Sequence, residues 1–235
     1  MKSLCLALLA CLPLAAVASD GKISKVNGSV RVEAGQSAGD VSTVNGSVTI
    51  EEGATAANVD TVNGSITIER NATVQKVESV NGGISLAADV KAASVETVNG
   101  TLKLAASAQV SGSVSAVNGS AQLAKGADIK GQLSNVNGKM NIDAAHVGGG
   151  LKTVNGDILV GADSRVEGGI LVEKPNANWF NKSNHKPPRI VIGPGAVVEG
   201  KLRFEHEVEL FVSDRAKIGA VEGATPQSFS GDAPK

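Results

Sequence analysis

The tripeptide Val-Asn-Gly recurs eight times at a nearly constant interval, and this repeat constrains the fold of the 235-residue chain more than any other feature. The asparagines are Asn27, Asn45, Asn63, Asn81, Asn99, Asn118, Asn137 and Asn155. They are separated in turn by 18, 18, 18, 18, 19, 19 and 18 residues. A period of this length is typical of solenoids, in which one small unit stacks on the next.

Aliphatic residues occupy fixed positions around each asparagine. Around Asn45 they are Val41 four residues before, and Val48 and Ile50 three and five residues after. The offset of two residues is the alternation of a β-strand, and no segment repeats with the helical period. One unit cannot bury its own apolar face, whereas parallel stacking places each aliphatic column on itself. We therefore expect an all-β, single-stranded parallel β-solenoid (β-helix) of about 10 coils with 18–19 residues each.

The Asn-Gly pair predicts a sharp corner between two strands. Glycine accepts positive φ at little cost, and asparagine accepts it better than most residues. A hairpin is less favoured, because the columns come into register only when coils stack in parallel. Stacked asparagines also predict a ladder in which each side-chain amide donates to the next. The alternative is a row of ligand-binding amides. Several Asn-Gly-Ser triplets match the glycosylation acceptor pattern, but the corner already explains the asparagine.

Residues 1–18 have the composition of a signal peptide. A lysine at position 2 precedes an apolar run over residues 4–14, and small residues end at Ala18. Cleavage there removes Cys5 and Cys11, so we expect a mature chain without cysteine. No other apolar stretch approaches 18 residues, which predicts no transmembrane segment in the mature chain.

The alternative for this segment is a lipoprotein signal that ends at a lipidated Cys11. Only ten residues would precede that cysteine, which is short for a signal. We therefore favour export to the periplasm or to the cell surface and medium, without a lipid anchor.

The rhythm of the repeat divides the rest of the chain. We expect the solenoid to span residues 19–224, with Val-Asn-Gly coils over 21–166. A polar, proline-containing loop insert is expected over 174–188, followed by C-terminal coils and a cap over 189–220. Residues 225–235 are polar and contain two prolines, and they predict a disordered tail.

Four aromatic residues are candidates for a contact or a cap. Trp179 and Phe180 lie in the insert, where they predict either a surface loop packed on the solenoid or a partner contact. Phe204 and Phe211 are bulky residues in the C-terminal coils. We expect them to close the last coil or to pack against a neighbour, because an open coil exposes apolar side chains and unpaired strand edges.

Two threonine columns were weighed as a binding face. One stands two residues before the asparagine, as at Thr43, Thr61 and Thr97, and the other includes Thr49 and Thr67. Both columns lose threonine along the chain, so the expected face is too irregular for ice.

The C-terminal segment Ile192 to Gly200 reads Ile-Gly-x-Gly-Ala-x-Val-x-Gly and resembles bactofilins, the polymer-forming bacterial cytoskeletal proteins. The Val-Asn-Gly-Ser-(Val/Ile) units resemble the adhesin repeat domains of bacterial envelope proteins. The two resemblances imply a parallel β-helix that associates end to end. The export signal departs from the bactofilin pattern, because bactofilins act on the cytoplasmic side, and it favours an envelope location.

The sequence carries few groups that could perform chemistry. Its net charge of −1 predicts no nucleic-acid partner. The three histidines, His146, His185 and His206, have no His or Cys partner at ligand spacing, so we expect surface polar residues rather than a metal site. Hydrolase, nucleotide-binding and dinucleotide motifs are lacking, and we expect no cofactor. These observations favour a non-enzymatic scaffold that self-associates. The alternative is an adhesin-like module that binds an envelope protein or polysaccharide through a solenoid face or the Trp179 loop.

Overall fold

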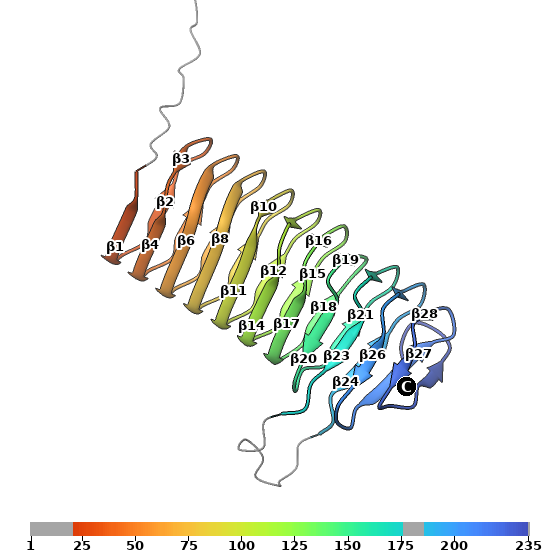
Figure 1. Cartoon of the computed structure of the whole chain (residues 1–235). Helices are drawn as coiled ribbons and strands as arrows, with labels where there is room; N and C mark the ends of the chain where they lie inside the picture. The colour runs from red at the N-terminus through yellow and green to blue at the C-terminus, as the bar shows by residue number, and fades with distance from the viewer. Residues whose placement is uncertain (1–20, 176–185, 235) are drawn as a thin grey trace, which may run out of the picture.

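The computed structural model describes residues 21–175 and 186–234, which form a rod of stacked coils (Figure 1). Every strand pair in it is parallel, and no helix occurs in the described residues. The predicted all-β parallel solenoid is confirmed, with about 11 turns where the repeat predicted about ten. The expected signal peptide, Trp179, Phe180 and His185 lie outside the described residues.

Each coil contributes strands to three columns, here named faces A, B and C. Face A holds the strands that lead into the Asn-Gly corner, and face B holds those that follow it. Face A consists of β1 (Ile23–Asn27), β4 (Val41–Asn45), β6 (Thr55–Asn63), β8 (Thr73–Asn81), β11 (Ser94–Asn99), β14 (Val114–Asn118), β17 (Leu133–Asn137), β20 (Leu151–Thr153), β23 (Ile170–Val172), β26 (Leu202–Phe204) and β29 (Val221–Glu222).

Face B is a separate 11-stranded sheet. It consists of β2 (Val30–Val32), β5 (Val48–Ile50), β7 (Ile66–Ile68), β9 (Ile84–Leu86), β12 (Leu102–Leu104), β15 (Ala121–Leu123), β18 (Met140–Ile142), β21 (Ile158–Val160), β24 (Arg189–Ile192), β27 (Glu209–Ser213) and β30 (Gln227–Phe229).

Face C consists of two-residue strands that close each coil: β3 (Ser37–Ala38), β10 (Lys91–Ala92), β13 (Gln109–Val110), β16 (Asp128–Ile129), β19 (His146–Val147), β22 (Arg165–Val166), β25 (Val197–Val198) and β28 (Lys217–Ile218). In two coils, β6 and β8 are nine-residue strands that run through faces C and A without a break. Where the spacing grows to 19 residues, Gly112 sits between β13 and β14. The extra residue therefore makes a third corner.

The core lies along the rod axis and is built from stacked small aliphatic side chains. The register places Val41 on Val59 in face A and Ile50 on Ile68 in face B, and all four are fully buried. Because identical residue types stack at each level, every column fills the same space in successive coils.

A second corner lies between faces B and C, and the sequence analysis did not identify it. Its residues have positive φ in nine coils: Gly35, Gly53, Asn71, Asp89, Ser107, Gly126, Ala144, Asp163 and Gly195. Non-glycine residues occupy several of these positions, so the corner has a conserved backbone shape but no sequence motif.

The C-terminal coils correct two expectations. Gln227–Phe229 forms β30, which pairs with β27, so the prediction of a disordered tail over 225–235 is wrong for these residues. Phe204 is buried in the core of β26 and does not lie on the last strand of the rod. Phe211 points out of face B between the buried Leu210 and the half-buried Val212. Within the described part of the chain, no helix is long and apolar enough to cross a membrane.

Candidate functional site

The eight corner asparagines form one continuous chain of side-chain hydrogen bonds. In each case the Nδ2 atom donates to the Oδ1 atom of the preceding coil, as from Asn45 to Asn27 at 3.0 Å and from Asn99 to Asn81 at 2.9 Å. The remaining bonds are 63→45, 81→63, 118→99, 137→118 and 155→137, at 2.9–3.2 Å. Because every interior amide is both donor and acceptor within the ladder, these asparagines have a structural role.

The corner glycines allow this close stacking. A Cβ atom built on Gly64 would overlap the carbonyl oxygen of Gly46 in the coil below, and the same holds at most other corners. The glycine N–H groups of residues 28, 46, 64, 82 and 119 donate to the asparagine carbonyl of the next coil, at 2.9–3.1 Å. Glycine is therefore needed here chiefly for space between coils, although Gly28 and Gly138 also have positive φ.

The threonine column two residues before the asparagine is not a surface. Thr43, Thr61 and Thr97 are 3–4% exposed and point into the rod. Their hydroxyls donate to the corner glycine carbonyl of the preceding coil, as from Thr61 to Gly46 at 2.9 Å. The expectation of an outward threonine face is wrong for this column, because strand alternation from the buried Val41 column turns it inward. The second column, with Thr49 and Thr67, does point outward.

Face A carries a shallow groove with a volume of about 600 Å³ along the first six coils. One side is an exposed valine row, in which Val44, Val62, Val80, Val98 and Val117 are each about 40% exposed. The other side is a polar row that includes Asp60, Glu78 and Glu96 in successive coils. Burial raises the pKa of the Asp60 carboxyl, and the neighbouring Glu78 charge raises it further. Lys76 lies 2.6 Å from Glu78 and offsets part of this negative charge.

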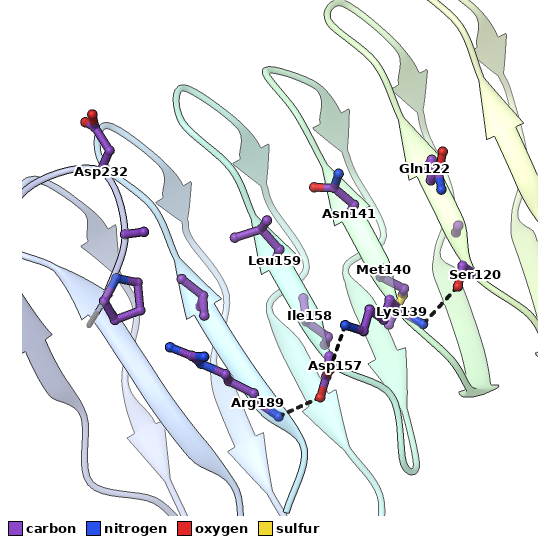
Figure 2. A pocket seen from close by; sticks show the side chains of 14 residues that line it. Ser120, Gln122, Lys139, Met140, Asn141, Asp157, Ile158, Leu159, Arg189 and Asp232 are labelled. Atoms are coloured by element: carbon purple, nitrogen blue, oxygen red, sulfur yellow. Dashed lines mark hydrogen bonds and ion pairs between the residues drawn. The ribbon is translucent and has the colours of Figure 1, made fainter.

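Face B carries a second groove, of about 530 Å³, near the C-terminal coils (Figure 2). Asp157 stands at its edge, where it accepts a hydrogen bond from the backbone N–H of Arg189 at 3.0 Å and lies 3.7 Å from Lys139 Nζ. The floor includes the outward side chains of Asn141 and Leu159. The groove thus combines one apolar stretch with ionic groups at one margin.

The C-terminal residues form the opposite wall of this groove. Asp232 and Pro234 line it, and Asp232 lies 3.6 Å from Arg215. The Arg189 guanidinium stacks over the ring of Phe211, 4.8 Å from its centre. The chain end therefore lies against face B.

The described histidines are half-buried rather than surface residues, which corrects the expectation for both. His146 Nδ1 lies 2.6 Å from Asp128 and its Nε2 lies 3.4 Å from Glu167. His206 Nε2 donates to the Val154 carbonyl at 2.9 Å and links two coils at the end of the asparagine ladder. Across residues 21–175 and 186–234, no group of three or more His, Cys, Asp or Glu side chains is arranged to hold a metal ion.

Both ends of the rod present strand edges. Among the described residues, β1, β2 and β3 pair only with the second and third coils. At the other end, β28, β29 and β30 each pair on one side only within the same part of the chain. These edges offer backbone N–H and C=O groups for pairing with another strand.

Comparison of the sequence with family models and curated proteins, and of the fold with solved structures, finds no match. The geometry alone therefore identifies the candidate surfaces. The two grooves and the end strands were not identified from the repeat, because they depend on which residues share a row across coils.

Proposed function

We propose that this chain is an exported, non-enzymatic structural protein of the bacterial cell envelope that assembles end to end. The observation that carries the proposal is the pair of parallel strand edges at the two ends of the rod. A first coil placed on a last coil would continue the same parallel strand pairing, so a head-to-tail contact forms an open filament.

The first coil has the features of a pairing edge. Val30 and Val32 direct their N–H and C=O groups toward the second coil, where Val30 N–H donates to Ser47 and Val32 C=O accepts from Glu51. Arg31, which lies between them, therefore directs its backbone groups away from the second coil. Among the described residues, this edge has neither a proline nor a covering strand, which are devices that block pairing.

The resemblances to bactofilins and adhesin repeats support a bacterial assembly role. The signal-like N-terminal segment supports an envelope location. Eleven coils at about 4.8 Å each make a unit about 50 Å long, so a filament would lengthen in steps of that size.

The experiment is light scattering of the purified protein followed by electron microscopy. The wild type should form filaments. Arg31→Pro removes an N–H from the outer edge without breaking a bond to the second coil, and it should leave folded monomers. Arg31→Thr is the control, because Thr49 occupies the equivalent position in the next coil, and it should still assemble. A wild type that stays monomeric at all concentrations would contradict the proposal.

A second candidate function is an adhesin-like binding module, favoured by the groove of Figure 2. Its apolar floor and ionic margin suit a polymer with apolar and charged faces, such as an envelope polysaccharide. Leu159→Glu should abolish capture of that polymer if the groove binds it. Deletion of residues 176–185 should do so instead if the Trp179 loop binds it, and unchanged capture in both variants would exclude both surfaces.

A further inference from the structure

The asparagine ladder has a chemical property that depends on position. An Asn-Gly pair can modify itself: the backbone nitrogen of glycine attacks the side-chain Cγ of asparagine after losing its proton to solvent. The Cγ–Nδ2 bond breaks, ammonia leaves, and a five-membered succinimide remains. Water then opens the ring at either carbonyl, which gives aspartate or isoaspartate. Glycine favours the reaction because no side chain hinders the attack.

Interior corners resist this reaction at both reacting groups. At Asn63, the side-chain amide donates to Asn45 at 3.0 Å and accepts from Asn81 at 3.1 Å. The attacking nitrogen, that of Gly64, donates its proton to the Asn81 carbonyl at 3.1 Å. Attack requires rotation of the side chain and release of that N–H, so the corner must first separate from coils on two sides.

Asn27 differs from the interior corners in each respect. Its Nδ2 has no acceptor among the described residues, and its Oδ1 accepts only from Asn45. Its strand, β1, pairs on one side only within the described chain. Gly28 has a φ of 103°, and nothing lies within 4 Å of a Cβ built on it, so the corner has room to move. This corner opens when contacts to a single coil are lost.

The opposite end of the ladder is more constrained. Asn155 also lacks one partner, because no further asparagine donates to its Oδ1 atom in the described residues. It nevertheless lies in the middle of the rod, with coils on both sides. The N–H of Gly156 donates to the buried hydroxyl of Thr153 at 2.9 Å, which holds the attacking nitrogen away from Cγ.

We infer that Asn27 is the first site of succinimide formation in the ladder, and that modification then proceeds coil by coil from this end. Isoaspartate adds a methylene to the backbone, so the first coil loses its register with β4. Asn45 then becomes the end of the ladder and acquires the one-sided environment that Asn27 had. The ladder therefore records chemical ageing in the order of its coils.

The experiment is incubation of dilute, monomeric protein in mildly alkaline buffer, followed by digestion and mass spectrometry of each Asn-Gly peptide. Monomers are required because end-to-end assembly would cover Asn27. We expect Asn27 to react at least about tenfold faster than Asn63 or Asn81, the ratio set by about 1.4 kcal/mol of opening free energy. Equal rates along the ladder, or faster reaction at an interior asparagine, would overturn the inference.

A chain with one added coil provides the matched control. A copy of residues 41–58 is inserted ahead of Ile23, which keeps the 18-residue register and gives Asn27 neighbours on both sides. Hydrogen exchange first establishes that the added coil is folded. Asn27 should then react at the rate of interior sites, and the new terminal asparagine should react first. Unchanged reaction at Asn27 in the folded, lengthened rod would mean that position in the ladder does not control the chemistry.

Discussion

The first eight coils and the last three hold together by different means. The first eight share the Val-Asn-Gly corner, the amide ladder and a core of small aliphatic residues. The last three lack this corner and contain larger side chains, including the buried Phe204 and the stacked Arg189–Phe211 pair. They also carry ion pairs between neighbouring coils, such as Lys201–Glu222 at 2.8 Å.

This difference shows two ways of joining coils in one rod. In the repeat region, identical residues stack so closely that even a Cβ atom has no space at the corner. In the C-terminal coils, side-chain volume and charge fill what the ladder no longer supplies. Because each coil contacts only its neighbours, a change should act mainly on the region that contains it.

The largest effect is expected at an interior corner glycine. Gly64→Ala would place a methyl group on the Gly46 carbonyl, so the coils must separate, and we expect a loss of about 3 kcal/mol or more. Gly53→Asn is the control. Gly53 has positive φ and open space around it, and Asn71 occupies the equivalent position in the next coil. Urea denaturation followed by circular dichroism measures both variants. Equal stability of the two would contradict the close-stacking account of the corner.

The next effect distinguishes the two C-terminal aromatics. Phe204→Ala leaves a cavity in the core and should cost about 3–5 kcal/mol. Phe211→Ala removes a half-exposed ring and its contact with Arg189, and it should cost about 1 kcal/mol. Hydrogen exchange should show that Phe204→Ala opens the last three coils while the first five stay protected. Uniform loss of protection along the rod would show that the two regions unfold as one unit.

A smaller effect is expected within the ladder. Asn81→Ala removes two amide hydrogen bonds and should cost about 1–2 kcal/mol, because these bonds are exposed to water. Asn27→Ala removes one and should cost about half as much. Denaturation midpoints of the two variants measure the difference. If the end variant is as damaging as the interior one, the ladder bonds do not contribute separately.

The repeat predicted the coil, its period and the stacking of asparagines, because columns of identical residues constrain register directly. It did not predict that the threonine column is buried, since the alternation had to be counted inward from Val41. The corner at Asn71 and Asp89 was also missed, because a backbone shape accepted by several residue types leaves no motif.

The candidate surfaces were harder to predict than the fold. The groove on face B depends on the chain end, which folds back beside Leu159 instead of forming a tail. The acidic row on face A exists only because Asp60, Glu78 and Glu96 share a register position in successive coils. Each residue alone is an ordinary surface charge, so the pattern becomes visible only after the coils are aligned in space.

The acidic row gives the smallest effect and belongs only to the repeat region, since Lys152 and Arg203 occupy this column farther along the rod. The pKa of Asp60 is raised in the fold by burial, and then by Glu78 and Asp40. A carboxyl with a raised pKa binds its proton more tightly in the folded state, so its ionisation lowers stability as pH rises through that pKa. Asp60→Asn should therefore stabilise the rod at neutral pH, by less than about 1 kcal/mol because the site is partly solvated. The gain should vanish below the pKa of the unfolded carboxyl. Asp89→Asn, which removes one charge at a corner that Asn71 also occupies, is the control. Denaturation midpoints of both variants across acid and neutral pH decide the matter, and a gain at Asp60 that persists in acid would show that charge is not its cause.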